Sequence, residues 1–114
     1  MKKQEDRTFN YKAASFTGLS AHNISAETIH ACFRAPVYKL PDEPALLGHL
    51  RQVVDARTKQ KFANVRIVII DEYQMVSKEL FAYLDTFLRH CDPARAEYPF
   101  AQRSIILAGK MSLL

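Results

Sequence analysis

Two adjacent carboxylates, Asp71 and Glu72, follow the most hydrophobic stretch of the sequence, in the string VRIVIIDEYQMVS. Neighbouring acids repel each other, and a buried carboxylate without a partner is costly. A bound cation removes that cost, and carboxylate oxygens are ligands that suit magnesium. The pair is therefore a candidate for chemistry with a metal ion and a phosphate.

An apolar strand that ends in Asp-Glu is the Walker B arrangement of nucleotide hydrolases. In that arrangement Asp71 would hold magnesium, usually through water, and Glu72 would act on the attacking water as a base or an orienting group. The alternative is a strand that simply ends in two solvated acids. The residue pair alone does not choose between these interpretations.

The elements around the acid pair alternate between strands and helices. Short apolar or β-branched runs predict strands at residues 8–16, 65–70 and 104–108. Apolar residues at helical spacing predict helices at residues 25–34, 44–57 and 77–90, with Ser25 and Ser77 as caps. Strands separated by helices indicate a parallel sheet, and ligands of such sheets bind at the carboxyl ends of the strands, where the acid pair lies.

Bulk composition limits the class of protein. The 114 residues suit one domain, and 48% apolar with 25% charged residues is typical of a globular chain. No apolar run is long enough to span a bilayer, and the polar first residues do not form a secretory signal. Cys32 and Cys91 have no CxxC spacing, which favours reduced thiols in an intracellular protein. The net charge of +4 permits contact with phosphates without requiring it.

Three strings carry a resemblance to a known family. VRIVIIDEYQMVSKELFAYLDTFLR resembles the second motif of the Pif-type and RecD-like 5′-to-3′ DNA helicases. TGLSAHNISAETIHACFRAPV resembles motif Ia of that family, and PFAQRSIILAGK resembles the strand that leads to its third motif. The three strings occur in family order, at family-like spacing, and cover most of the chain.

The resemblance implies an α/β fold, namely part of the three-layer P-loop NTPase (RecA-like) fold, with a parallel sheet that lacks the P-loop strand. Residues 1–114 would form a single partial motor domain. Motif Ia would lie at about 16–34, Walker B at about 65–77 and the sensor strand at about 103–110. The strand at 65–70 would be central between the other two, with the helices on one face, a bare apolar opposite face, and an unpaired edge at 104–108.

The resemblance also implies site residues. Glu72 would be the catalytic acid, Asp71 and Glu72 would hold magnesium, and the intact enzyme would use Mg²⁺ and ATP. Four residues would lie beside the path of single-stranded DNA, namely Thr17, Gly18, Asn23 and His30. For His30, the residue taken alone favours the other interpretation, a helix-surface histidine near Glu27 and Arg34.

The sequence departs from the family pattern at the nucleotide cradle. No GxxxxGK[ST] string occurs, so no cofactor-binding P-loop residues are assigned. Lys110 stands where the third motif has an acid, Leu113 where it has a phosphate-sensing Gln, and Ala26 replaces a usual Gly of motif Ia. The chain therefore resembles an internal piece of a helicase motor, whose remainder would be a missing partner.

The expected function is that of a fragment of an ATP-dependent 5′-to-3′ DNA helicase, an enzyme that couples ATP hydrolysis to unwinding, and the fragment is expected to be inactive alone. The alternative is a non-catalytic module that binds single-stranded DNA or a protein partner. Family resemblance places the protein in the nucleus, away from membranes, in DNA repair, recombination and telomere maintenance.

Two further groups of side chains fit a structural role better than a functional one. Phe81, Tyr83 and Phe87 fall at helical spacing, which favours core packing over base stacking. The basic run contains Arg57, Lys59, Lys61 and Arg66, and a solvated connector explains it better than nucleic-acid contact does.

Overall fold

A four-stranded parallel sheet forms the centre of the molecule in the computed structural model, which describes residues 10–17, 27–36, 40 and 42–109. The strands are β1 (Tyr11–Ser15), β2 (Glu27–Thr28), β3 (Ile67–Asp71) and β4 (Ser104–Leu107), in the order β2-β1-β3-β4. The predicted central position of the strand before the acid pair is confirmed. The two-residue strand β2 was not predicted, because so short a strand has no sequence period.

The register of the sheet brings the carboxyl ends of its strands to one level. Ser15, the last residue of β1, is paired with Asp71, the last residue of β3. On the other side, Ile70 is paired with Leu107 at the end of β4. Groups that follow β1, β3 and β4 therefore meet at one edge of the sheet, as expected for parallel strands.

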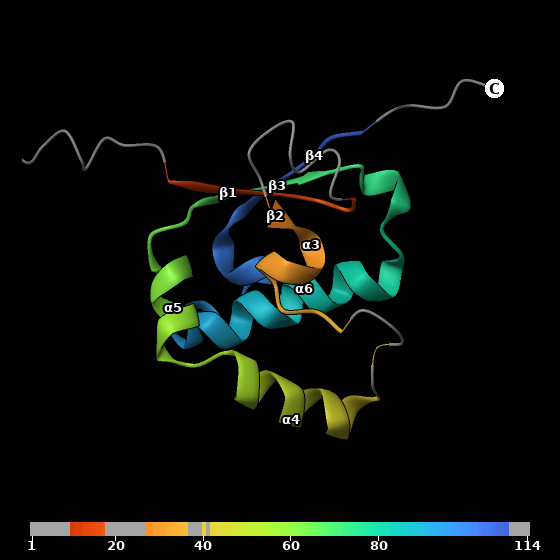
Figure 1. The fold of residues 1–114 in the computed structure, drawn as a ribbon. Coiled ribbons are helices and arrows are strands. Elements are labelled where there is room, and N and C mark those ends of the chain that lie inside the picture. Colours follow the sequence, from red (N-terminus) through yellow and green to blue (C-terminus); the bar gives the residue numbers. More distant parts are fainter. Residues whose placement is uncertain (1–9, 18–26, 37–39, 41, 110–114) are drawn as a thin grey trace, which may run out of the picture.

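All four helices lie on the same face of the sheet (Figure 1). They are α3 (Ile29–Cys32), α4 (Glu43–Val53), α5 (Ala56–Ala63) and α6 (Lys78–Cys91). Three short 3₁₀ turns complete the described elements: η1 (Tyr73–Met75), η2 (Pro93–Arg95) and η3 (Pro99–Gln102). Among the described residues, every helix is too short or too polar to cross a lipid bilayer.

The predicted single helix at 44–57 is wrong, because the chain forms two helices there. The α4 helix ends at Val53, and Asp55 begins α5 by accepting a hydrogen bond from the Thr58 amide at 2.9 Å. An Asp cap satisfies an orphan amide at a helix start and therefore favours a new helix over continuation of the old one. The second helix carries most of the basic run predicted to be a connector, and its cationic side chains are exposed.

The predicted helix at 25–34 is also wrong in its bounds. Only Ile29–Cys32 is helical, and its cap is Thr28, whose hydroxyl accepts from the Ala31 amide at 3.2 Å. Glu27 and Thr28 are used as strand β2 instead. Ser25, the predicted cap, lies outside the described residues.

An aromatic cluster joins three helices beneath the sheet. Phe33 at the end of α3, Phe62 of α5 and Phe87 of α6 are fully buried. Their ring centroids lie 5.4 to 5.6 Å apart, at the separation of favourable aromatic pairs. The predicted core role of Phe87 and Tyr83 is thus confirmed, while Phe81 is partly buried against the same core.

The α6 helix agrees closely with its prediction. Ser77 caps it and accepts from the Leu80 amide at 3.0 Å, and Arg89 and His90 occupy its last turn. Both cysteine thiols are free and buried, in accord with the expectation of reduced thiols.

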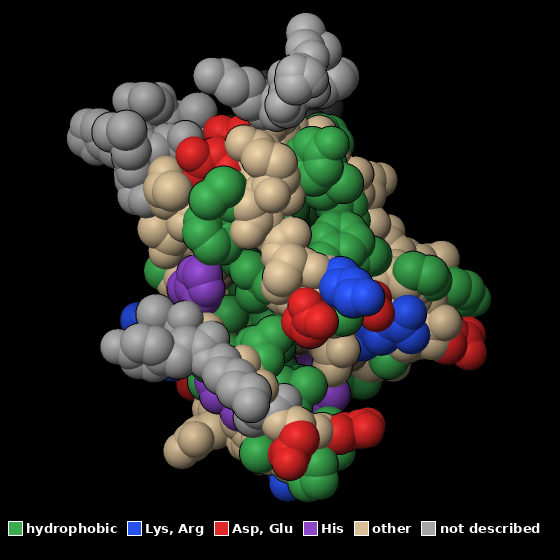
Figure 2. All heavy atoms as spheres, turned by 90° about the vertical axis from the view of Figure 1, so that its right-hand side faces the viewer, with side chains coloured by type: hydrophobic (Ala, Val, Ile, Leu, Met, Phe, Trp, Pro, Cys, Tyr) green, Lys and Arg blue, Asp and Glu red, His purple; other side chains and the backbone are tan. Residues whose placement is uncertain are grey.

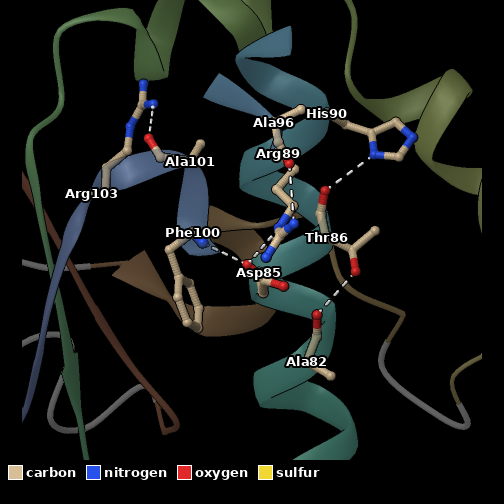
Figure 3. A network of polar contacts seen from close by, with 9 residues as sticks. All are labelled: Ala82, Asp85, Thr86, Arg89, His90, Ala96, Phe100, Ala101 and Arg103. Atoms are coloured by element: carbon tan, nitrogen blue, oxygen red, sulfur yellow. Dashed lines mark hydrogen bonds and ion pairs between the residues drawn. The ribbon is translucent and has the colours of Figure 1, made fainter. Parts of the chain in front are cut away.

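Two carboxylates fix the loop that leads to β4, namely Asp85 on α6 and Asp92 directly after α6. Asp85 accepts from the Phe100 amide at 2.6 Å and from Arg89 Nε at 3.0 Å (Figure 3). Asp92 accepts from the buried Arg103 at 2.6 Å. Between these anchors, Phe100, Ala101 and Gln102 all have left-handed backbone with φ of 50 to 65°.

The face of the sheet opposite the helices is open within the described part of the chain. Tyr11 and Ile106 on that face are both 48% exposed, and Ala13, Ile67 and Ile69 between them are partly exposed. The β4 strand pairs only with β3 among the described strands. Among the described residues this face is therefore apolar and partly exposed, and for the whole chain the bare face and the unpaired edge stay predictions.

Candidate functional site

The acid pair lies at the carboxyl edge of the central strand. Asp71 is the last residue of β3, and Glu72 follows it with a left-handed backbone, φ 60° and ψ 40°. For a residue other than glycine this conformation costs about 1–2 kcal/mol, and such costs are found where the surroundings fix a residue for a function. The turn directs the chain from β3 into η1 and orients the Glu72 side chain toward β1.

The end of β1 holds the Glu72 carboxylate. Glu72 Oε1 accepts hydrogen bonds from Ser15 Oγ at 2.7 Å and from the Thr17 amide at 2.8 Å. The Thr17 hydroxyl lies 3.0 Å from the same oxygen and 3.2 Å from Oε2. Hydrogen bonds to a carboxylate are about twice as strong as neutral ones, so this arrangement fixes the orientation of Glu72.

The Asp71 carboxylate is only partly engaged. Its Oδ1 accepts from the Glu72 amide at 2.8 Å, which stabilises the left-handed turn. Its second oxygen makes no hydrogen bond to any described residue. Asp71 therefore presents a free oxygen at the edge of the sheet, whereas Glu72 is oriented by its neighbours.

The end of β4 fixes the acid turn from the other side. The Ala108 amide donates to the Ile70 carbonyl at 2.9 Å, and the Tyr73 amide donates to the Ala108 carbonyl at 3.0 Å. Gly109 follows and lies so close to Gln74 and Tyr73 that a Cβ at this position would overlap the Gln74 amide oxygen. The turn that carries the two acids is thus held between β1 and β4.

An apolar pocket of about 230 Å³ opens beside the acid turn. Its lining comes from β3, β4, η1 and the start of α6, namely Ile70, Tyr73, Val76, Ser77, Lys78, Phe81 and Leu107. Figure 2 shows the molecule from this side, with acidic side chains near the top of the view next to exposed apolar groups. Ser77 is accounted for by its capping role.

The comparison with protein families identifies the chain. The model described as PIF1-like helicase matches residues 2–114. The chain belongs to this family. No curated protein sequence matches it.

Solved structures agree with this family and show the fold. Pif1 from Bacteroides sp. in complex with ADP-AlF4 superposes with a TM-score of 0.76 at 23% identity, over 92% of this chain and 23% of that one. Pif1 from Candida albicans gives 0.66 at 24% identity, over 88% and 22%. Bacteroides Pif1 bound to ssDNA gives 0.69 at 22% identity, over 92% and 23%. The chain thus spans about a quarter of the length of these helicases and has the predicted RecA-like α/β fold.

In this PIF1-like chain the Asp71 carboxylate suits a magnesium ion. Magnesium is usually bound by one or two protein carboxylates together with waters and substrate phosphates, and not by an all-protein cage. The free oxygen of Asp71 meets that need, and no group of three or more His, Cys, Asp or Glu residues lies together among the described residues. Glu72 fits less well as a direct ligand, because its Oε1 already accepts three hydrogen bonds.

The four residues expected beside DNA divide into two groups. Gly18 and Asn23 lie outside the described residues. Thr17 lies two residues after the end of β1, with its hydroxyl on Glu72. His30 lies on α3, partly buried, with its ring edge-on to Phe16 at 5.8 Å between centroids. This packing gives His30 a structural contact in addition to its expected role.

Sequence reasoning missed Ser15 as a member of the site. Ser15 is fully buried and donates to Glu72 from a strand 57 residues earlier in the chain. The only sequence signal was a small polar residue, two positions before Thr17, in an otherwise weak strand.

Proposed function

We propose that this chain supplies the acid-pair and motif Ia parts of an ATP-driven 5′-to-3′ DNA helicase motor. The observation that carries the proposal is the Glu72 carboxylate, fixed by Ser15 and Thr17 directly after Asp71 at the carboxyl edge of the central strand. Family membership supports helicase chemistry. Nuclear location and roles in DNA repair, recombination and telomere maintenance belong to the same proposal and rest on the family alone.

In the proposed mechanism, Glu72 orients the attacking water and takes its proton, as a fixed carboxylate can. Ser15 and Thr17 keep this carboxylate at one position, so little reorganisation is needed when water attacks. Asp71 would hold magnesium, which when bound with ATP neutralises charge on the β- and γ-phosphates. The γ-phosphate itself must be positioned by a P-loop, and the 114 residues contain no such string.

The same residues suggest how hydrolysis and DNA would communicate. Thr17 follows the strand expected beside single-stranded DNA, two residues after its last residue, and its amide and hydroxyl contact Glu72. If residues that follow Thr17 bind a DNA phosphate, only one or two residues would therefore separate that contact from the Glu72 carboxylate. Phosphate contacts position a DNA strand without reading its base sequence. DNA binding is therefore expected to be independent of base sequence and to weaken steeply as the salt concentration rises.

Phosphate release tests the proposal. The 114-residue chain alone should hydrolyse no ATP, because loss of positioning can remove roughly 7 kcal/mol or more of barrier lowering. Fusion to a strand–helix unit with GxxxxGK[ST] should restore nucleotide binding more than turnover. In that fusion, Lys110→Asp with Leu113→Gln should raise turnover. Glu72→Gln should abolish the gain and leave the affinity for ATP nearly unchanged.

Nucleotide titration separates the proposal from a non-catalytic module. A module that binds single-stranded DNA or a protein would show no ATP dependence, even in the fusion. If the unmodified 114-residue chain hydrolysed ATP in the presence of DNA, the proposal that it lacks the phosphate-binding P-loop needed for hydrolysis would be contradicted. In the fusion, Asp71→Asn should lower the affinity for ATP in the presence of magnesium. If variant and parent fusion had the same affinity for ATP at every magnesium concentration, the assignment of Asp71 as the residue that holds magnesium would be contradicted.

A further inference from the structure

A second pocket, of about 410 Å³, lies between α3 and α5, away from the acid pair. Its lining consists of Cys32, Arg34, Arg57, Thr58 and Lys61. The α5 helix supplies three of the five lining residues and leads into the amino end of β3 (Figure 1), whereas the acid pair follows the carboxyl end of that strand. The proposed helicase activity makes no use of this pocket.

The charges around the pocket leave an excess of positive charge. Three of its five lining residues are cations, and none is an acid. Among the described residues, neither the Arg34 nor the Arg57 guanidinium has a carboxylate within ion-pair distance.

Two acids that interact with the lining residues already have partners. Glu27 contacts Lys61 at 3.3 Å and Lys12 at 3.9 Å. Asp55, which interacts electrostatically with Arg34, accepts from the Thr58 amide as the cap of α5. The three lining cations and Lys12, counted with the Glu27 and Asp55 carboxylates, give this group of residues a net charge of +2.

The floor of the pocket is neutral and polar enough for an anion. Burial raises the pKa of the Cys32 thiol to about 12, with the Glu27 carboxylate adding to the effect, so the thiol carries no charge at neutral pH. The other residue of the lining that carries no charge is Thr58. The Glu27 carboxylate beside Cys32 is paired with Lys61 and Lys12, so the Arg34 and Arg57 guanidinium groups remain for a bound anion.

The backbone at Arg34 is fixed in a conformation that residues other than glycine rarely adopt. Its φ is 53°, and its carbonyl accepts hydrogen bonds from His49 Nε2 at 2.9 Å and Tyr83 Oη at 3.1 Å. The α4 and α6 helices therefore hold the base of this side chain. A guanidinium on a fixed backbone loses less entropy when it binds a ligand than one on a flexible backbone.

We propose that this pocket is a phosphate-binding site built from Arg34, Arg57 and Lys61. Two guanidinium groups with planar donor forks and one ammonium suit the oxygens of a phosphate. The pocket volume falls within the range of about 300–1,000 Å³ typical of small-molecule sites, so it has room for groups attached to the phosphate. The phosphate belongs either to a nucleic-acid backbone or to a free phosphorylated molecule, since both present the same oxygens.

Amide chemical shifts of the ¹⁵N-labelled 114-residue chain test this site. Inorganic phosphate, added against chloride at matched ionic strength, should shift the amides of Arg34, Arg57, Thr58 and Lys61 most. A thymidine oligonucleotide should shift the same amides at lower concentration, and phosphate should displace it, if the source is a nucleic-acid backbone. Shifts with phosphate alone would assign the pocket to free phosphorylated molecules.

Charge-matched variants separate the pocket from general electrostatics. Arg34→Gln with Arg57→Gln should weaken phosphate binding at least about tenfold, because it removes both forks. The control, Arg51→Gln with Lys59→Gln, removes the same charge from exposed positions outside the pocket and should change binding less than about twofold. Equal losses in both variants, or wild-type shifts spread over the surface, would overturn the proposal.

Discussion

The Thr17 hydroxyl donates to the Glu72 carboxylate, at 3.0 Å from Oε1 and 3.2 Å from Oε2, across 55 residues of sequence. Thr17→Val keeps the shape of the side chain and removes this donor. Because hydrogen bonds to charged groups contribute about 1.5–3 kcal/mol, we expect the free energy of unfolding in urea to fall by about that amount. Thr17→Ser, which keeps the hydroxyl, should remain within about 1 kcal/mol of the parent chain.

A double-mutant cycle shows whether this loss comes from Glu72 itself. In a Glu72→Gln background the acceptor has no charge, so Thr17→Val should cost less than it does in the parent chain. A coupling free energy of about 1 kcal/mol or more is expected for such a pair. Additive effects would mean that the hydroxyl stabilises the fold through other contacts.

The Asp92–Arg103 ion pair should make stability depend on pH. The Arg103 side chain is 2% exposed and donates to Asp92 at 2.6 Å. The hydrogen bond from Arg103 holds the pKa of the Asp92 carboxyl below its ordinary value; burial opposes this effect, and Arg95 adds to it. The stabilisation is therefore fully present above the unfolded pKa of about 3.9 and is lost as pH falls through the lower folded pKa.

Asp92→Asn tests that pH dependence. At neutral pH the variant should lose about 2–3 kcal/mol, because the buried guanidinium keeps its position without its counter-charge. Its unfolding free energy should fall less steeply than that of the parent chain as pH is lowered below 4. The remaining slope includes Asp55, whose pKa is lowered mainly by hydrogen bonds from Thr58. Identical slopes in variant and parent would contradict the role of the ion pair.

Two glycines should respond in opposite directions to the same change. Gly48 lies inside α4, and a Cβ there would meet no atom within 4 Å. Gly48→Ala should stabilise the chain by about 0.5–1 kcal/mol through helix propensity. Gly109→Ala would displace the exposed end of the Gln74 side chain and crowd Tyr73, whose Cδ2 and amide nitrogen would lie 3.1 and 3.3 Å from the added Cβ, and should cost up to about 1 kcal/mol. Thermal unfolding measures both, and the Tyr73 and Ala108 amide shifts should change only in the second variant.

Gln102 offers a test of the left-handed turn before β4. It is exposed, with φ of 65°. Gln102→Gly removes the strain that a Cβ causes in left-handed backbone, but it also raises the entropy of the unfolded chain. The strain relief is the larger effect, so we expect the free energy of unfolding to rise by about 0.5–1 kcal/mol. Gln102→Ala should give no such gain, because alanine retains the Cβ. Equal unfolding free energies for the two variants would argue against the left-handed backbone.

Sequence reasoning predicted the parts of the fold that depend on local pattern. The apolar strand β3, the cap at Ser77 and the apolar face of α6 each have a period or a capping residue within a few positions. The helix break at Asp55 also had a local signal, since Asp55 precedes Thr58 at capping distance, but the apolar pattern before it extended the predicted helix too far.

The candidate site could be predicted only in part, because its geometry depends on distant contacts. The acid pair was recognised from its neighbours in sequence. Its fixation by Ser15 and Thr17 required the parallel pairing of strands more than 50 residues apart. The burial of Arg103 was missed for the same reason, since its partners, Asp92 and the Phe62 carbonyl, come together only through packing of the helices.

The open face of the sheet links the folding of this part of the protein to its surroundings. A segment that covers Tyr11, Ile69 and Ile106 would bind the folded sheet and not the unfolded chain. By mass action, such a segment multiplies the ratio of folded to unfolded molecules by one plus its concentration divided by its Kd. An uncovered apolar face next to an unpaired strand edge favours self-association instead. Folding and assembly of this sheet are therefore one coupled equilibrium, and the melting temperature of the chain should change with whatever occupies that face.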